Sequence, residues 1–114
     1  MEDCIFCKIA GKEAPSDMVY QDDLVCAFRD ISPKAPTHIL IIPKKHLRSM
    51  VEAKEDDKEL LGHLLYVANQ IARKEGISED GFRVVINSGS HTGQMVWHLH
   101  IHLIGGRKMS WPPG

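Results

Sequence analysis

Apolar and polar residues alternate most regularly near the end of the chain, where residues 97–104 read WHLHIHLI. Because successive side chains of a β-strand point to opposite faces, this alternation predicts a strand with one apolar face and one histidine face. Leu99, Ile101 and Leu103 lie on the apolar face, which we expect to pack on a core. The histidine face needs a separate explanation.

The hydrophobic pattern predicts four further strands. Short runs rich in apolar and β-branched residues are separated by turn residues, by the proline-containing loop 32–36 and by the Gly/Ser-rich loop 88–94. These strands cover residues 18–21, 24–30, 38–42 and 82–87.

Apolar residues spaced three and four apart predict one long helix over residues 53–75. Arg73 and Lys74 suit the C-terminal end of a helix dipole, and Gly76 suits the position after its last turn. The predicted order is β-β-β-α-β-β, which is typical of an α+β fold with the helix on one face of an antiparallel sheet. A chain of 114 residues suits a single domain over 1–114.

The composition gives no reason to expect a nucleic-acid or membrane partner. The net charge is −1, so bulk electrostatics gives no reason to expect a nucleic-acid partner. No apolar run approaches the roughly 20 residues of a membrane helix, and we expect no membrane partner. The acidic N-terminus does not match a signal peptide, so we expect a cytoplasmic protein, with the nucleus as a second compartment. In these reducing compartments the three cysteines do not predict a disulfide framework.

The histidine face of His98, His100 and His102 has three interpretations. In the first, the rings are ordinary polar residues on a half-exposed strand. In the second, they hold zinc, copper or iron. In the third, one of them is a nucleophile. A nucleophilic imidazole needs its second nitrogen to hold the proton, often against a backbone carbonyl. The small residues of loop 88–94 allow backbone amides to approach an anion closely. The third interpretation predicts phosphoryl or nucleotidyl transfer.

The run from His98 to Ile104 matches the His-φ-His-φ-His-φ-φ motif of the histidine triad (HIT) superfamily, where φ is apolar. Other segments resemble the Hint-type histidine triad nucleotide-binding proteins, which are purine nucleoside phosphoramidases. The resemblance implies a HIT-like fold: an antiparallel five-stranded sheet, one long helix, a short N-terminal helix, and sheets joined across a homodimer. The segments are FRDISPKAPTH (28–38), IPKKH (42–46), NSG (87–89), GQ (93–94) and WPPG (111–114).

The resemblance also implies a reaction. Nucleoside 5′-phosphoramidates, such as adenosine 5′-monophosphoramidate, are cleaved at the P–N bond through a nucleotidyl-histidine intermediate. By position, His100 is the nucleophile and His98 orients it through its backbone carbonyl. His102 faces the phosphate and the leaving group, and His38 supports this face from a neighbouring strand. The family's catalysis requires no cofactor, and the expected ligands are purine nucleoside monophosphates and phosphoramidates.

The nucleotide-binding residues that the resemblance implies form an apolar slot for the purine, a carboxylate for the ribose hydroxyls and a group around the phosphate. The slot contains Ile5, Phe6, Ile9, Phe28 and Ile31; Asp30 binds the ribose; Asn87, Gly93, Gln94, Met95, Val96, His100 and His102 surround the phosphate.

Several of these residues have a structural alternative. Asp30 also suits the cap of the Ser32–Pro33 turn, and the slot residues also suit an ordinary core. Met95 stands where many Hint-type proteins have serine, which removes one hydroxyl donor worth about 1 kcal/mol. The preferred leaving group is therefore left open.

Cys4 and Cys7 form a C-x₂-C pair, which cytosolic proteins use for zinc or redox chemistry more often than for a disulfide. A zinc site needs two more ligands. By resemblance to members of the wider superfamily, His46 and His98 supply them and complete a structural zinc site. The alternative is two reduced cysteines near a flexible N-terminus. We expect Cys26 to be a small buried hydrophobe.

The C-terminal tail 109–114 places Trp111 beside two prolines. The resemblance implies that this tail contributes Trp111 to the active site of the partner subunit, whereas the alternative is a frayed terminus.

Two other functions are alternatives to the phosphoramidase. One is a non-catalytic nucleotide-binding or scaffold protein. The other is a dinucleotide polyphosphate hydrolase, against which the WPPG tail argues.

Overall fold

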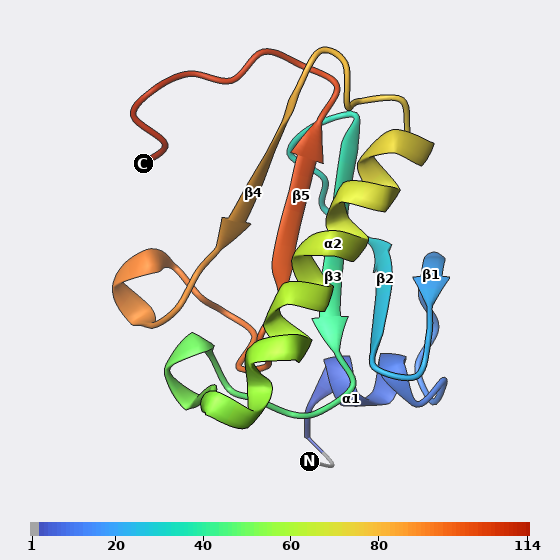
Figure 1. Ribbon diagram of the computed structural model, residues 1–114, viewed down its shortest axis with the longest axis vertical. Helices are drawn as coiled ribbons and strands as arrows, with labels where there is room; N and C mark the ends of the chain where they lie inside the picture. The colour runs from blue at the N-terminus through green and yellow to red at the C-terminus, as the bar shows by residue number, and fades with distance from the viewer. Residues whose placement is uncertain (1–2) are drawn as a thin grey trace.

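The computed structural model describes residues 3–114, which form a five-stranded antiparallel sheet in the order β1-β2-β3-β5-β4 (Figure 1). This confirms the predicted α+β class, including the short N-terminal helix α1 and the long helix α2, which crosses one face of the sheet. The elements are α1 (Ile5–Ala10), β1 (Met18–Gln21), β2 (Val25–Arg29), β3 (Thr37–Pro43), α2 (Lys58–Lys74), β4 (Phe82–Ile86) and β5 (Ile101–Gly105).

The sheet has an apolar core on each face, because side chains alternate along its strands. On one face, Leu99, Ile101 and Leu103 pack beneath α2, as the sequence pattern predicted. On the other face, Phe6 of α1 packs against Phe28 and against the rings of His98 and His100. The triad histidines therefore lie on the α1 side of the sheet. Cys26 is fully buried on that side, as predicted.

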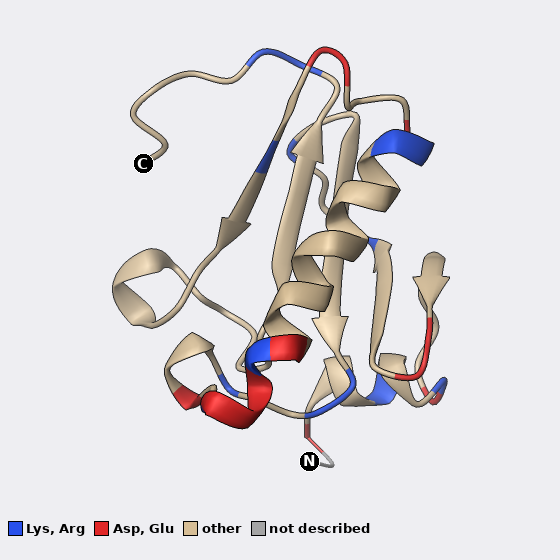
Figure 2. Cartoon of the chain, in the orientation of Figure 1, with Lys and Arg blue, Asp and Glu red and all other residues tan. Residues whose placement is uncertain are grey.

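Helix α2 begins five residues later than predicted. Residues 50–52 and 55–57 form the short 3-10 helices η1 and η2 instead, and acidic side chains gather there (Figure 2). The Asp57 carboxylate accepts a hydrogen bond from the Lys54 backbone N–H and lies 2.7 Å from the Lys45 ammonium. The acidic residues 55–57, which lie within the predicted helix 53–75, therefore form η2 immediately before α2, and the Asp57 carboxylate caps η2.

The histidine segment is a regular strand over only part of its predicted length. Strand β5 begins at Ile101, so the prediction of a continuous strand from residue 97 is wrong. Continuing the β3–β5 register would place Pro43 opposite Leu99, and proline has no N–H for the ladder. The Leu99 N–H donates to the Leu47 carbonyl instead, at 2.6 Å.

Asp22 fastens the β1–β2 hairpin to α2. One carboxylate oxygen accepts the backbone N–H groups of Leu24 and Val25, and the other accepts the Tyr20 hydroxyl and lies 2.6 Å from Nε2 of His63. Burial raises the pKa of Asp22, but the hydrogen bonds outweigh burial and hold this pKa well below its usual range.

Asp22→Asn is expected to lower the free energy of unfolding by about 1–3 kcal/mol at pH 7. A carboxylate whose pKa is depressed by folding stabilises the protein above its unfolded pKa, about 3.9, and this contribution is lost as the pH falls through the folded pKa. Urea unfolding at pH 7 and pH 3 measures the effect. The difference between variant and wild type should shrink at pH 3, and a difference independent of pH would contradict this role.

The charges at the two ends of α2 differ in sign. Basic residues lie in its last turn and acidic residues precede its first turn, as expected from the helix dipole (Figure 2). In residues 3–114, no helix combines the length and apolar character needed to cross a membrane.

Candidate functional site

A cavity of about 390 Å³ lies between α1, the end of β2 and the histidine segment. Its walls are mostly apolar, and its convergent polar groups include the Asp30 carboxylate and the rings of His100 and His102. Such a composition is typical of a small-molecule site. The structure brings every predicted nucleotide-binding residue to this cavity: Ile5, Phe6, Ile9, Phe28, Asp30, Ile31, Asn87, Gly93, Gln94, Met95, Val96, His100 and His102.

Four lining residues were not predicted: Pro15, Ser16, Arg29 and Leu40. Leu40 had a signal, because it lies two positions after His38 on one strand and so shares its face. The Arg29 guanidinium is occupied by a two-point contact with Glu75, at 2.9 and 3.0 Å. Arg29 therefore ties the end of β2 to the residue after α2 more than it serves the cavity.

Two of the predicted slot and phosphate residues lie at the mouth of the cavity rather than in its wall. Ile31 is fully exposed and Met95 is 88% exposed. In the described residues nothing covers these apolar side chains. The mouth is therefore an apolar surface open to a ligand or to another chain.

The ring of His100 has a defined orientation and proton position. Its Nδ1 lies 2.8 Å from the backbone carbonyl of His98, and a carbonyl can only accept, so Nδ1 carries the proton. In the neutral ring, Nε2 then holds a lone pair. His100 lines the cavity, so this lone pair is available to an electrophile bound there.

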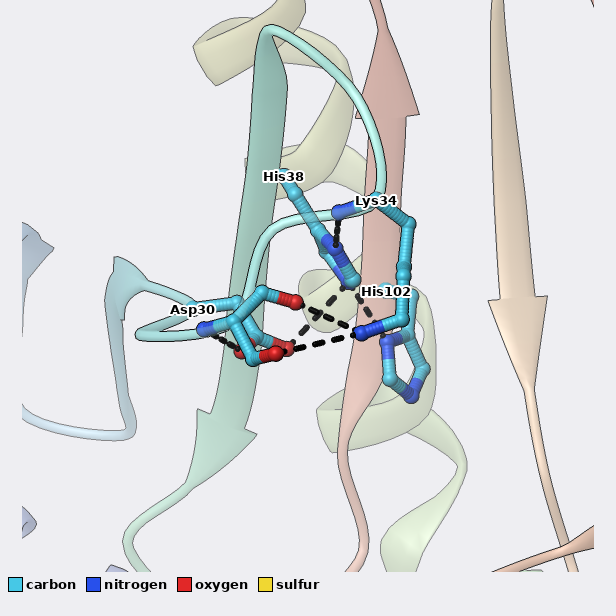
Figure 3. Close-up of polar contacts among 5 residues, drawn as sticks. Asp30, Lys34, His38 and His102 are labelled. Carbon is cyan, nitrogen blue, oxygen red and sulfur yellow. Dashed lines mark hydrogen bonds and ion pairs between the residues drawn. The ribbon is translucent and has the colours of Figure 1, made fainter.

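His38 and His102 form a second hydrogen-bonded group beside the cavity (Figure 3). Nε2 of His38 lies 2.9 Å from Nδ1 of His102 and 3.4 Å from the Asp30 carboxylate. Burial lowers the pKa of His38, and burial together with the charges of His100 and His38 lowers the pKa of His102 to about 4. Both rings are therefore neutral at pH 7.

Asp30 makes the predicted turn cap and also lines the cavity. One carboxylate oxygen accepts the Ser32 backbone N–H at 2.8 Å, which is the predicted turn cap. The other oxygen faces His38, and the side chain also lines the cavity. A carboxylate has about four acceptor positions, so capacity for ligand hydroxyls remains.

Cys4, Cys7, His46 and His98 place one possible ligand atom each within 4.8 Å of one another. Nε2 of buried His98 lies 2.8 Å from the Pro43 carbonyl, so it carries the proton and leaves a lone pair on Nδ1. This Nδ1 lies 3.3 Å from the Cys4 sulfur and 3.1 Å from Nδ1 of His46. Metal-bound histidines are held in this way, and two thiols with two imidazoles suit tetrahedral zinc.

Asp30, His38 and His102 are a second group with possible ligand atoms close together. Here the Lys34 backbone N–H donates to Nδ1 of His38 at 3.0 Å, so Nε2 of the neutral ring must carry the proton. A protonated nitrogen offers no lone pair to a metal. We therefore interpret this group as a hydrogen-bonded chain, in contrast to the Cys/His group.

Together these features define an α+β protein in which a histidine with a free ring nitrogen borders an apolar, small-molecule cavity. The family model described as HIT domain matches residues 11–109, and the chain belongs to this family. This confirms the superfamily that the histidine motif indicated.

Similar proteins agree with this assignment. A maize protein described as a 14 kDa zinc-binding protein is 58% identical over 112 residues, which is 96% of this chain and 87% of the maize protein. The crystal structure of a HIT family hydrolase from Legionella pneumophila has a TM-score of 0.96 at 53% identity, and the alignment covers 98% of this chain and 100% of that one.

Two less similar structures have descriptions that concern ligands. A histidine triad nucleotide-binding protein from Candida albicans has a TM-score of 0.83 at 31% identity, over 98% of this chain and 85% of that one. A Zn-bound histidine triad family protein from Mycobacterium smegmatis has a TM-score of 0.83 at 30% identity, over 96% and 81%.

Proposed function

We propose that this chain hydrolyses purine nucleoside 5′-phosphoramidates to a nucleoside monophosphate and an amine, through a nucleotidyl-histidine intermediate. The observation that carries the proposal is the free Nε2 of His100 at the wall of an apolar cavity. The similar Legionella protein is described as a hydrolase and the Candida protein as nucleotide-binding, which supports the reaction class and the ligand.

In the proposed first step, the Nε2 lone pair of His100 attacks phosphorus. The P–N bond of the substrate breaks, and the amine leaves with its electron pair and takes a proton from solvent. Water then attacks phosphorus and releases a proton to solvent, and the bond to His100 breaks and restores the ring lone pair. The His98 carbonyl accepts the Nδ1–H of His100 throughout and stabilises the positive charge that the ring gains. These steps need no cofactor.

The rest of the cavity would bind the nucleoside and the phosphoryl oxygens. Phe6 and Phe28, whose rings are 5.4 Å apart and nearly perpendicular, form an apolar wall for the purine. The carboxylate of Asp30 would accept the ribose hydroxyls. Asn87 and the backbone amides of residues 93–96 would donate to the phosphoryl oxygens as negative charge develops there.

The deciding experiment is turnover of adenosine 5′-monophosphoramidate by the purified protein, with the products separated by chromatography. We expect AMP and ammonia in equal amounts. Binding of AMP without turnover would favour the nucleotide-binding or scaffold function, and preferential cleavage of a diadenosine polyphosphate would favour the sister hydrolase activity.

Asp30→Asn is expected to weaken AMP binding about 10-fold or more, because hydrogen bonds to a charged acceptor are worth about 1.5–3 kcal/mol. Calorimetric titration of both proteins with AMP and with its 2′,3′-dideoxy form measures this loss. Wild type should prefer AMP, and the variant should lose most of that preference. A wild type that binds both nucleotides equally well would refute the ribose contact. Asn retains an oxygen for the Ser32 cap, so the turn is preserved.

We also propose one structural zinc ion at Cys4, Cys7, His46 and His98. The proton positions on His98 support it, as does the Zn-bound description of the mycobacterial protein. The ion would join the N-terminal end of α1 to the loop after β3 and to the histidine segment, and it would supply stability rather than a step of the reaction.

We propose a homodimer in which the tail of each subunit contributes Trp111 near the cavity of the other. Strand β4 is an edge of the sheet, and Leu65 and Tyr66 of α2 are half-exposed. The tail is anchored on β4, because the Arg83 guanidinium donates to the Ser110 carbonyl and stacks near the ring of Trp111. From there it extends outward past β4 (Figure 1).

Deleting residues 109–114 is expected to change the relative kcat/KM values of phosphoramidates with different amines several-fold, with little change in AMP affinity. The reason is that Trp111 would touch the leaving group rather than the purine. Light scattering gives the oligomeric state, and steady-state kinetics gives the selectivity. A monomeric wild type, or an unchanged selectivity after the deletion, would contradict this role.

A further inference from the structure

Two ring nitrogens at the cavity, Nε2 of His100 and Nε2 of His102, are left without a hydrogen-bond partner among residues 3–114, whereas each Nδ1 is bonded. The rings are adjacent, with centroids 5.0 Å apart. What the site offers to a phosphoryl group depends on which of these two nitrogens carries a proton. The His98 carbonyl places the proton of His100 on Nδ1. The nitrogen of His102 that carries the proton has still to be identified.

The proton on His102 follows from a chain of hydrogen bonds that starts at a backbone amide (Figure 3). The Lys34 N–H can only donate, so Nδ1 of His38 accepts, and the proton of that neutral ring is on Nε2. This N–H faces Nδ1 of His102 at 2.9 Å and lies farther, at 3.4 Å, from the Asp30 carboxylate. If Nδ1 of His102 also carried a proton, two hydrogens would point at each other, so the His102 proton is on Nε2.

We propose that the Lys34 backbone amide fixes this protonation pattern, so that His102 presents an N–H and His100 a lone pair to the phosphoryl group of the substrate. Lys34 is then a positioning residue, which acts through His38 without touching the substrate. The inference rests on the proposed function for its substrate, but the proton positions themselves do not depend on it.

The pattern matters because phosphoryl oxygens carry negative charge. An Nε2–H on His102 donates a charge-assisted hydrogen bond to such an oxygen while His100 attacks. With the opposite tautomer, the lone pairs of both rings would face the same phosphoryl group, and the one on His102 would repel its oxygens. Removing one preorganised donor of this kind typically slows an enzyme about 10²-fold or more.

Hydrogen bonds hold the segment that carries the Lys34 amide. On its carbonyl side, the Arg107 guanidinium donates to the Lys34 carbonyl at 2.9 Å. The Lys34 ammonium also donates to the Ser32 carbonyl at 2.8 Å, at the exposed side of the loop (Figure 3). His38 itself is buried, and the partner of its Nδ1 is the Lys34 N–H at 3.0 Å. The Arg107 contact uses the Lys34 backbone and is therefore kept in a variant that lacks the Lys34 side chain.

The test compares Lys34→Ala, which keeps the backbone N–H, with Lys34→Pro, which removes it. In protein labelled with ¹⁵N-histidine, NMR distinguishes protonated from unprotonated ring nitrogens. In wild type and Lys34→Ala we expect the proton of both His38 and His102 on Nε2. In Lys34→Pro we expect His38 to shift toward the Nδ1–H form and His102 with it, and kcat to fall at least 10-fold below Lys34→Ala.

Replacing the Lys34 amide nitrogen by an ester oxygen is the second variant, and it leaves the side chain and the loop unchanged. A proton on Nδ1 of His38 or His102 in wild type would overturn the proposal without any variant. Unchanged ring tautomers and kcat in the ester variant would overturn it as well. A wild type with the expected tautomers but no phosphoramidate turnover would instead refute the proposed function.

Discussion

His100→Asn is expected to reduce phosphoramidate turnover at least about 10³-fold and to leave AMP affinity within a few-fold of wild type. The asparagine side chain is close in size to the imidazole and its amide can still donate to the His98 carbonyl, but it has no nucleophilic nitrogen. His100→Ala should lose as much activity, because the same bond to phosphorus cannot form. Single-turnover kinetics measures the rate, and calorimetry measures the affinity.

The control for this experiment is His63→Asn. His63 lies on α2, on the other side of the sheet, and contacts Asp22 rather than the cavity. Its variant should keep the wild-type turnover number. Mass spectrometry of wild type that is quenched rapidly in base, where a phosphorus–nitrogen bond to histidine is more stable than in acid, should locate the nucleotide on the peptide that contains His100. More than about one per cent of wild-type turnover in His100→Asn would remove His100 as the nucleophile.

Protein purified without added metal is expected to contain about one zinc per chain, and the Cys4→Ser, Cys7→Ser double variant none. A ligand present at about a thousand times its dissociation constant adds about 4 kcal/mol to folding, so loss of zinc should cost stability on this scale. Elemental analysis and urea unfolding measure the two effects. Cys26→Ala is the matched control, because Cys26 is buried on β2 outside the metal group.

Loss of zinc should affect binding more than chemistry. The residues between the two cysteines, Ile5 and Phe6, form part of α1 and line the cavity, so a loosened α1 weakens the nucleoside wall. His100 is oriented by the backbone carbonyl of His98, which the metal does not use. We therefore expect KM to rise more than kcat falls. Zinc absent from wild type, or zinc retained by the double variant, would disprove the site.

The sequence predicted the regular parts of this fold well, because alternation and helical spacing are local properties. Strand β1 and the end of α2 agree with the pattern to within a residue. The start of α2 and the start of β5 do not, because distant partners decide them. The contact of Asp57 with Lys45 stabilises η2 just before α2, and Leu47 accepts the N–H of Leu99.

In the candidate site too, some features could be predicted from the sequence and others depend on residues far apart in the chain. Residue types and the family resemblance were enough to predict most of the side chains that line the cavity, but not Pro15, Ser16, Arg29 and Leu40. The hydrogen-bonded chain beside it depends on the register of β3 against β5, which sets Leu40 opposite His102 and brings His38 into diagonal reach. Ser16 lies in a loop without any periodic signal, so its place in the lining could not be inferred. The positions of the histidine ring protons could not be inferred from the sequence either, because they follow from distances between ring nitrogens and backbone groups.

Pro43 has a consequence for anyone who redesigns this protein for stability. Replacing a proline near the end of a strand with a good β-former is an ordinary way to lengthen a sheet. Here a longer β3–β5 ladder would pair residue 43 with Leu99, so the Leu99 N–H would compete for the Pro43 carbonyl that accepts from Nε2 of His98. A change chosen for thermal stability would then move residue 98, whose carbonyl orients His100, and screening by melting temperature alone would miss the resulting loss of activity.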